Sequence, residues 1–355
     1  MAAPRFHQPT IGDIREETPD AVSLGFAVPA WLARAYRFLP GQYLTLRATI
    51  EGEDIRRSYS ICSGLDDGEL RVAVKRVAGG AFSNFIHDRL KPGDVIAAMT
   101  PAGGFILPAA EGPRTIVAVA CGSGITPILS HLKTVLAREP ATSFVLFYGN
   151  RTGREIMFSE ELAVLKDRHL DRLSVTHVLS REMQDLPVLQ GRLDRARIEL
   201  LLRGVAAIDH VLLCGPAAMM DEATATFAAF GVAPERIHRE YFTPGEGGRA
   251  ALAPVAGAPA AAPAAIAEIV IDGRHHEVPL PEGVSIIDAA RAQGIELPFS
   301  CKGGMCCSCR ARLVSGRAEM AVNYSLQPWE IEAGFILTCQ ARPLTPRLVL
   351  DYDQV

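Results

Sequence analysis

The chain has 355 residues, 48% hydrophobic and 21% charged, which is ordinary for a globular protein and enough for two or three domains. Its formal net charge of −4 gives no basis for nucleic-acid binding, which favours clustered basic charge. We expect no membrane span, because no run of about 18 strongly apolar residues exists. The first residues lack the apolar core of a signal peptide, so we expect a cytoplasmic protein.

Residues 1–110 are predicted to form an antiparallel β-barrel or sandwich. Short alternating stretches at 43–48, 68–75 and 95–99 are separated by Pro-Gly and Asp-Gly turn signals. Such alternation is typical of antiparallel strands that each cover one side of a core.

Three short motifs in this block suit a flavin nucleotide: RSYS at 57–60, Val74-Lys75, and GGAFSNF at 79–85. An arginine can pair with pyrophosphate. The ring of Tyr59 can lie against the isoalloxazine, and Ser60 can hydrogen-bond near its N5 atom. The glycines let backbone N–H groups approach phosphate. RSYS alone is equally typical of an ordinary strand, so the prediction depends on the order of the three motifs.

Residues 111–243 have a different pattern and are predicted to form an α/β domain. Strand-like apolar runs occur at 115–120, 144–148, 174–180 and 210–214, with helical patterns between them. Buried strands that alternate with helices favour a parallel sheet. We expect Thr126 to be the N-cap of the first helix and Pro127 its first residue.

The segment CGSGITP, at 121–127, follows the first of these strands and opens the first helix. Its glycines permit close approach to a pyrophosphate, and a helix N-terminus attracts the anion. The pattern is G-x-G-x-x-P rather than G-x-G-x-x-G, so by itself it is a weak fingerprint of a dinucleotide site.

Arginine and cysteine residues stand at the ends of later strands. Arg151 and Arg181 follow the second and third strands, and Cys214 ends the fourth. Ligands of parallel sheets bind beyond such strand ends. An arginine there can bind a phosphate through two hydrogen bonds, although an ordinary surface arginine is the alternative. Cys214 is either a site residue or a small buried side chain.

Residues 244–265 are low-complexity Ala, Pro and Gly and are predicted to be a linker, because such a segment has little to bury. The linker either lets the last domain change its docking partner or is a spacer docked in one position. Residues 266–355 then open with a predicted hairpin around Asp272-Gly273. A short helix should follow, capped by Ser285 and closed by Gly294.

Four cysteines in this last block have the C-x4-C-x2-C…C spacing of plant-type [2Fe–2S] ferredoxins: Cys301, Cys306, Cys309 and Cys339. Glycine and serine between them suit a loop wrapped tightly around the cluster. Zinc is the alternative, but zinc sites usually use paired C-x2-C units or histidines, and no histidine lies near Cys339. Cys307, which lies between two of these cysteines, is expected to be a non-ligand that points away from the cluster. The alternative is that it replaces one of the four ligands in a damaged cluster.

Residues 1–242 resemble the ferredoxin–NADP reductase superfamily through RSYS, VKRVAGGAFSNFI, GSGITP and the Cys-Gly segment at 214–215. The resemblance implies a multidomain α/β plus β chain. Its parts would be a Greek-key FAD-binding β-barrel, a Rossmann-like NADP-binding α/β domain and a C-terminal β-grasp [2Fe–2S] ferredoxin domain.

The resemblance also implies the cofactor contacts. Those expected for FAD are Arg57, Tyr59, Ser60, Val74, Lys75, Gly80, Phe82 and Ser83, with Glu240 and Phe242 closing over the flavin. Those expected for the nicotinamide nucleotide are Gly122, Ser123, Gly124, Thr126, Asn150, Arg151, Ser180, Arg181, Cys214, Gly215 and Met219. Ser180-Arg181 resembles the pair that holds the 2′-phosphate of NADPH, so NADPH is preferred over NADH. Tyr59, Ser60 and Cys214 are expected at the reacting atoms.

The order of domains, with the ferredoxin last, resembles the reductases of bacterial oxygenase systems. It implies electron flow from NADPH to FAD, to the cluster and then to the diiron oxygenase subunits of a multicomponent complex that acts on an aryl-CoA thioester. A steroid or aromatic-ring hydroxylase system is an alternative partner. An iron–sulfur redox sensor without turnover is the alternative of a different class.

Overall fold

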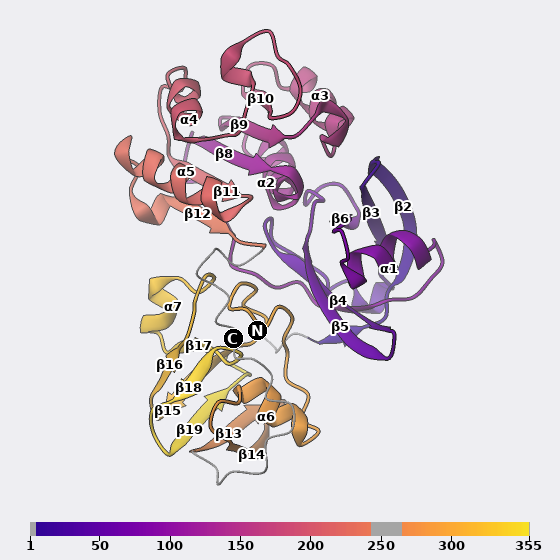
Figure 1. The fold of residues 1–355 in the computed structure, drawn as a ribbon, viewed down its shortest axis with the longest axis vertical. Helices are drawn as coiled ribbons and strands as arrows, with labels where there is room; N and C mark the ends of the chain where they lie inside the picture. The colour runs from indigo at the N-terminus through magenta and orange to yellow at the C-terminus, as the bar shows by residue number, and fades with distance from the viewer. Residues whose placement is uncertain (1–4, 243–264, 355) are drawn as a thin grey trace. The chain divides into compact units, whose positions relative to one another are not determined.

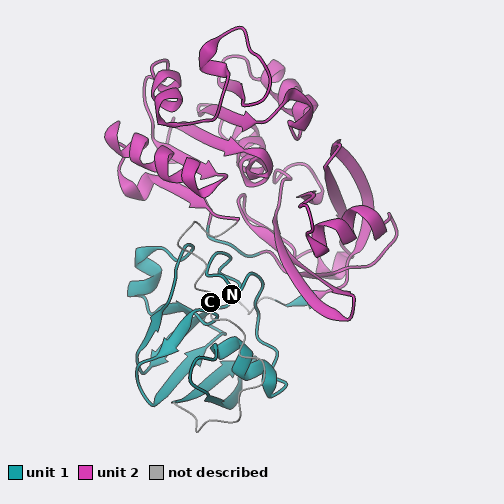
Figure 2. Ribbon diagram, viewed as in Figure 1, with its two compact units in different colours: residues 1–6, 102–104, 244–355 teal, residues 7–101, 105–243 magenta. Residues whose placement is uncertain are grey.

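The computed structural model describes residues 5–242 and 265–354 (Figure 1). The chain divides into two compact units, one of residues 7–101 with 105–243, the other of 244–355 with 1–6 and 102–104 (Figure 2). Of the predicted linker 244–265, only Ala265 lies within the described residues, and it begins a strand. No helix in these described ranges has the length and apolar character needed to cross a membrane.

The first part of the larger unit is the predicted antiparallel barrel. One sheet has the order β1-β7-β4-β5 and the other β2-β3-β6. The strands are β1 (Phe6–His7), β2 (Thr10–Thr18), β3 (Ala21–Ala27), β4 (Tyr43–Ile50), β5 (Glu53–Ser60), β6 (Leu70–Lys75) and β7 (Ala97–Met99), with helix α1 at Ala81–Arg89. Leu24, Leu44, Val72 and Phe82 are buried between the sheets, which makes α1 part of the barrel core.

The second part of this unit is a five-stranded sheet in which every neighbouring pair is parallel, in the order β10-β9-β8-β11-β12. This confirms the α/β prediction. The strands are β8 (Thr115–Cys121), β9 (Ser143–Asn150), β10 (Leu173–Leu179), β11 (His210–Cys214) and β12 (Ile237–Glu240). The helices are α2 (Ile125–Arg138), α3 (Ser159–Arg168), α4 (Arg195–Leu202) and α5 (Ala217–Ala229).

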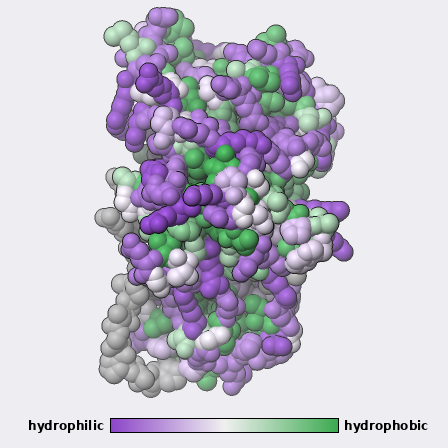
Figure 3. All heavy atoms as spheres, turned by 90° about the vertical axis from the view of Figure 1, so that its right-hand side faces the viewer, coloured by the Kyte–Doolittle hydropathy of each residue, from purple (hydrophilic) through white to green (hydrophobic). Residues whose placement is uncertain are grey.

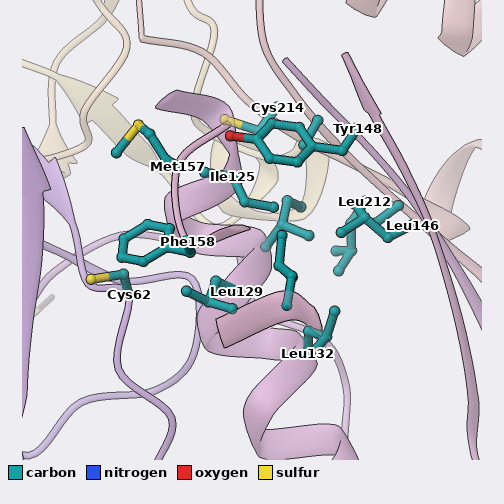
Figure 4. Close-up of a cluster of buried hydrophobic side chains, with 14 of the residues drawn as sticks. Cys62, Ile125, Leu129, Leu132, Leu146, Tyr148, Met157, Phe158, Leu212 and Cys214 are labelled. Atoms are coloured by element: carbon teal, nitrogen blue, oxygen red, sulfur yellow. The ribbon is translucent and has the colours of Figure 1, made fainter. Parts of the chain in front are cut away.

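Residues that alternate along these strands are buried on opposite faces of the sheet. Ala118, Leu146 and Leu212 share a core with Leu129 of α2, and Figure 4 shows this cluster, with Tyr148 and Cys214 among its members. The neighbouring residues of the same strands form a second core with α4 and α5. The sheet is therefore covered on both faces, and ligands can reach it only at the strand ends.

Helix α2 also contacts the barrel, which places the two parts of the larger unit against each other. Ser130 Oγ donates to the carbonyl of Ser63 at 2.6 Å, and the fully buried His131 ring lies 2.8 Å from the carbonyl of Phe105. Gly41, with φ of +87°, is required here because a Cβ would overlap the Phe105 backbone. These buried polar contacts hold α2, and with it the face of the parallel sheet that α2 covers, against the barrel.

The smaller unit contains the predicted hairpin and capped helix. Its main sheet has the order β14-β13-β19-β15-β17, with β13 and β19 parallel, and β16 pairs with β18. The strands are β13 (Ala265–Ile271), β14 (Arg274–Leu280), β15 (Arg310–Ser315), β16 (Ala318–Met320), β17 (Phe335–Leu337), β18 (Ala341–Pro343) and β19 (Arg347–Asp351). The helices are α6 (Ile286–Ala292) and α7 (Pro328–Glu332). The Ser285 hydroxyl accepts from the amide of Asp288 at 3.1 Å, so it is the N-cap predicted for α6.

The face drawn in Figure 3 is mainly hydrophilic, with hydrophobic residues in separate areas. Single exposed apolar side chains are ordinary on protein surfaces. The described residues that expose most of a large apolar side chain include Trp31, Met183 and Trp329.

Candidate cofactor sites

Strand β5 places the three residues of the RSYS motif predicted to contact flavin. Arg57 is exposed, Tyr59 is half-buried and Ser60 is buried. The Tyr59 ring lies 6.1 Å from the Phe82 ring of α1, centroid to centroid. Burial raises the pKa of Tyr59, so its phenol stays neutral at ordinary pH. The side of β5 that faces α1 therefore carries an aromatic, neutral surface next to an exposed cation, which suits a flavin ring and its phosphates.

The N-terminus of α1 fits an anion. Its N-cap is Gly80, which has no side chain to accept from the first-turn amides, so these donors are open to a ligand. A Cβ on Gly80 would come within 2.8 Å of Ser83 Oγ, and Ser83 Oγ accepts from the amide of Val77 at 3.1 Å. The preceding β6 ends with Val74, which is buried, and with Lys75, whose Nζ lies 3.4 Å from Asp20.

The glycine loop after β8 is packed tightly between two neighbouring strands. It forms a 3-10 turn over Gly122–Gly124, and α2 begins at Ile125 without a side-chain cap. A Cβ on Gly124 would overlap the carbonyl group of Cys214 at the end of β11. The Tyr148 hydroxyl of β9 donates to the Gly122 carbonyl at 2.9 Å. The Ile125 amide donates to the carbonyls of Gly122 and Ser123, so the glycine loop is fixed directly before the positive end of α2, where a pyrophosphate can be attracted.

The prediction that Thr126 is the N-cap of α2 is wrong. The N-cap is Gly124, so Thr126 is the second helical residue and Pro127 the third. The Thr126 hydroxyl donates to the Ser123 carbonyl at 3.0 Å and does not accept from the helix. Pro127 is still tolerated because the first-turn amides have no partner within the helix.

The predicted arginines lie side by side because the pairing of β9 with β10 continues past the strand ends. The Ser180 amide donates to the Asn150 carbonyl at 2.9 Å, and the Arg181 amide to the Arg151 carbonyl at 2.8 Å. Both arginine side chains are exposed. Asn150 Nδ2 is buried and has no hydrogen-bond partner among the described residues. Two guanidinium groups and an unused amide at one strand edge are suited to the phosphate and ribose of a nucleotide.

Two acidic side chains lie next to the paired segments that carry Arg151 and Arg181. Glu182 Oε2 accepts from the Gly153 amide at 2.7 Å, and Glu155 lies 3.8 Å from Arg151.

Cys214 and Glu240 are register partners on β11 and β12, at the same edge as the glycine loop. Burial raises the pKa of the Cys214 thiol well above its ordinary value, so Cys214 is a neutral thiol rather than a thiolate nucleophile. A Cβ on Gly215 would come within 2.5 Å of the Met219 side chain, and Phe242 is partly exposed two residues beyond β12. The structure thus brings the nicotinamide-side candidates to one edge.

The four predicted ligand cysteines of the smaller unit lie together and form two interacting pairs. The Cys301 amide is 3.4 Å from Cys306 Sγ, and a hydrogen bond with Cys306 lowers the pKa of Cys301 to about 7. A hydrogen bond with Cys309 likewise lowers the pKa of Cys339. Within the described residues, no group of three or more His, Cys, Asp or Glu side chains converges on one ion position. Two thiols for each of two irons is the arrangement that a [2Fe–2S] cluster needs.

Backbone amides also face these sulfurs. The amides of Gly303 and Met305 point to Cys301 Sγ at 3.3 and 3.4 Å. Gly304 has φ of +76°, and a Cβ there would press on the backbone of Val322. Cys307, with φ of +50°, packs against the apolar core of the unit. These features fit the predicted cluster loop, with Cys307 turned to the core.

Sequence reasoning missed several residues that position these sites. Tyr148 fixes the glycine loop, and Gln340 Nε2 donates to the Lys302 carbonyl within the cysteine loop at 2.7 Å. Thr338 Oγ1 donates to the Cys309 carbonyl at 2.8 Å. The only signal in the sequence was that each stands next to a motif residue or strand end, which does not reveal a contact made across the fold.

Comparisons with known proteins agree with this arrangement. Three family models match in chain order: an oxidoreductase FAD-binding domain at 10–106, an oxidoreductase NAD-binding domain at 118–225, and a 2Fe-2S iron-sulfur cluster binding domain at 269–344. The chain is 42% identical to one of the subunits of the 1,2-phenylacetyl-CoA epoxidase of Escherichia coli (strain K12), over 98% of each chain. It is 35% identical to the ferredoxin reductase component of the 3-ketosteroid-9-alpha-monooxygenase of Rhodococcus rhodochrous, over 97% of this chain and 96% of the relative.

A solved structure of phthalate dioxygenase reductase, described as a modular structure for electron transfer from pyridine nucleotides to [2Fe–2S], also matches. The TM-score is 0.58 with 25% sequence identity, and 98% of each chain is covered. The three-part architecture predicted from the sequence is therefore confirmed, with FAD, nicotinamide and [2Fe–2S] domains in that order.

Proposed function

Because the chain belongs to the ferredoxin-reductase family of NAD(P)H-dependent oxidoreductases that serve oxygenase systems, we propose that it is the reductase of a phenylacetyl-CoA 1,2-epoxidase. It would carry electrons from NADPH through FAD and the [2Fe–2S] cluster to the diiron oxygenase of that complex. The observation that carries this choice is the 42% identity, over 98% of both chains, to the matching component of such an epoxidase.

The FAD site is proposed on β5, the end of β6 and the start of α1. When bound, FAD accepts two electrons together from a nicotinamide and releases them singly, as a one-electron cluster requires. Arg57 and the open amides of α1 would bind the pyrophosphate, and Tyr59 would cover the ring. Ser60, buried at the end of β5, would hydrogen-bond near the reacting flavin atom.

The nicotinamide nucleotide is proposed to bind at the carboxyl edge of the parallel sheet. The start of α2 would hold its pyrophosphate, and Arg151 with Arg181 would hold the 2′-phosphate that NADPH has and NADH lacks. Cys214, at the end of β11, would position the nicotinamide ring against the flavin, and its register partner Glu240 on β12 would close over the flavin together with Phe242.

A cytoplasmic location is part of the proposal. None of the eight cysteines, all of them within the described residues, forms a disulfide, and thiols persist in reducing compartments. Fractionation of the source cells, with the protein recovered among periplasmic or membrane markers, would contradict this.

A second candidate partner is a steroid-hydroxylating oxygenase, favoured by the 35% identity to the reductase of a 3-ketosteroid monooxygenase over nearly the whole chain. With either partner, this chain would use the same FAD, nicotinamide and cluster sites, so the two proposed functions differ only in the protein that accepts the electrons.

The test is reconstitution. The purified, cofactor-loaded chain is mixed with NADPH, the oxygenase components of the epoxidase and phenylacetyl-CoA, and the epoxide is quantified directly, since NADPH consumption also includes electrons leaked to oxygen. The control lacks only this chain. Epoxide that depends on the chain supports the proposal. No epoxide, together with rapid cytochrome reduction by NADPH, would reject the epoxidase and leave the reductase assignment intact.

A further inference from the structure

Two hydroxyl groups lie buried behind the cysteine pair Cys309 and Cys339. Thr338 immediately precedes Cys339, and Tyr352 follows β19; both residues have no exposed surface. Their side-chain oxygens are 2.6 Å apart, and Thr338 Oγ1 is 2.8 Å from the carbonyl oxygen of Cys309. The flavin and nicotinamide sites make no use of either residue.

The direction of this hydrogen-bond chain follows from its last member. A carbonyl oxygen only accepts, so the single hydroxyl proton of Thr338 is donated to Cys309. The hydrogen bond between Thr338 and Tyr352 must then be donated by the tyrosine. Both O–H dipoles consequently point the same way, from the core toward a backbone carbonyl of a ligand residue, and aligned hydrogen bonds strengthen each other.

The backbone of the sheet anchors this hydrogen-bond chain at its Tyr352 end. The Tyr352 amide donates to the Val270 carbonyl of β13 at 2.9 Å, directly after the parallel pairing of β13 with β19. The Thr338 amide reaches the same Cys309 carbonyl at 3.2 Å. The Cys309–Cys339 pair is therefore connected to the centre of the sheet through Tyr352, while Cys301 and Cys306 belong to the loop.

We propose that Tyr352, acting through Thr338, is a positioning residue that holds the Cys309–Cys339 half of the cluster site and raises the reduction potential of the bound cluster. Reduction adds negative charge, which O–H dipoles directed toward the ligand residue stabilise. The inference rests on the [2Fe–2S] assignment and not on which oxygenase accepts the electrons.

The test is a redox titration of the full-length, cofactor-loaded protein alone, with no oxygenase present. Tyr352→Phe keeps the buried ring and removes only the hydroxyl. We expect its cluster midpoint potential to become more negative, with altered electron paramagnetic resonance of the reduced cluster and an unchanged FAD potential. Thr338→Val should shift the potential in the same direction, because it removes both hydrogen bonds, while Thr338→Ser keeps the hydroxyl and should behave like the natural protein.

Thr345→Val is the matched control, since the Thr345 hydroxyl also donates to a backbone carbonyl, that of Arg347 at 3.0 Å, in the same unit. It should leave the potential unchanged. If Tyr352→Phe retains iron and melts at a lower temperature but keeps the natural potential and spectrum, the hydrogen bonds of Tyr352 and Thr338 are only structural and the proposal is overturned. Should Tyr352→Phe fail to hold iron, Thr338→Val decides, and a natural potential in that variant overturns the proposal equally.

Discussion

The two exposed arginines at the ends of β9 and β10 give the most direct residue-level prediction. Arg181→Ala should raise the KM for NADPH about tenfold to a hundredfold, since a charge-assisted hydrogen bond contributes roughly 1.5–3 kcal/mol and about 1.4 kcal/mol is tenfold. The KM for NADH should change little, because NADH has no 2′-phosphate. Steady-state kinetics of dye reduction with both nucleotides measures this.

Arg236→Ala is the control for that measurement. Arg236 is also exposed but precedes β12, at the opposite edge of the sheet. Equal losses with NADPH and NADH in Arg181→Ala would show that Arg181 does not read the 2′-phosphate.

Cys214 supports a second prediction at this scale. Because Cys214 is completely buried at the edge proposed to bind the nicotinamide, Cys214→Ala should loosen the ring and slow flavin reduction by about tenfold to a hundredfold. Stopped-flow absorbance of the flavin under anaerobic conditions follows this step. Cys62→Ala removes another buried thiol from the same unit, one that donates to the Arg71 carbonyl, and should reduce flavin at the natural rate. A natural rate in Cys214→Ala would make Cys214 a packing residue.

Residues whose role depends on local spacing could be predicted from the sequence, and residues that act across the fold could not. The four cysteines proposed as ligands have the spacing typical of a plant-type [2Fe–2S] loop, so they could be selected from the sequence alone. The Tyr148 hydroxyl reaches Gly122 from 26 positions away, and Tyr352 reaches Thr338 from 14. A tyrosine in a strand is typical of any core, so only the folded register reveals these contacts.

At the scale of elements, the start of α2 is pressed directly against the end of β11. Gly124→Ala should push them apart, because the added Cβ overlaps the Cys214 carbonyl. We expect a higher KM for NADPH and a loss of about 1–3 kcal/mol in the free energy of unfolding. Gly204→Ala, where a Cβ meets no atom within 4 Å, is the matched control in the same domain. Unchanged kinetics in Gly124→Ala would contradict the tight packing of the nucleotide loop.

Helix α2 also shows that sequence rules for helix capping can misplace the first residue of a helix. Thr followed by Pro is a typical helix start. Rules of this kind correctly predicted the hairpin and the Ser285 cap of the smaller unit. In α2 the helix begins earlier, because the glycine turn before it already has helical geometry at Gly124. A capping rule considers side chains, whereas here the approach of two backbones decided the boundary.

At the scale of the whole molecule, composition separated three blocks and a linker, but the flavin and nicotinamide blocks fold as one compact unit. The sequence does not show this, because the joining contacts come from α2 and from barrel turns far apart in the chain. Lys133 of α2 bonds to Asp67 of a barrel turn, and the Thr134 hydroxyl accepts from the Leu65 amide at 3.1 Å. Electron transfer needs the two sites held at a fixed separation, and this junction supplies it.

His131 makes that junction sensitive to acid. Burial lowers its pKa from the ordinary 6.5 to about 4, and nearby His238 and Arg114 act in the same direction, while Glu139 and the Phe105 carbonyl oppose it. The folded state holds His131 neutral, whereas the unfolded chain takes up a proton below about pH 6.5. Stability is therefore complete above pH 6.5 and is lost as the pH falls toward 4, by about 2 kcal/mol at pH 5.

His131→Gln keeps a donor for the Phe105 carbonyl but cannot titrate. We expect it to flatten the decline in melting temperature between pH 7 and 5, followed through the fluorescence of released flavin. Part of the slope should persist, because burial also lowers the pKa of His238 to about 4. His275→Gln, which alters an exposed histidine of the other unit, should keep the natural slope. An identical slope in His131→Gln would mean that this histidine is not where the junction responds to acid, and that other histidines whose pKa burial lowers, such as His238 and His177, carry the effect.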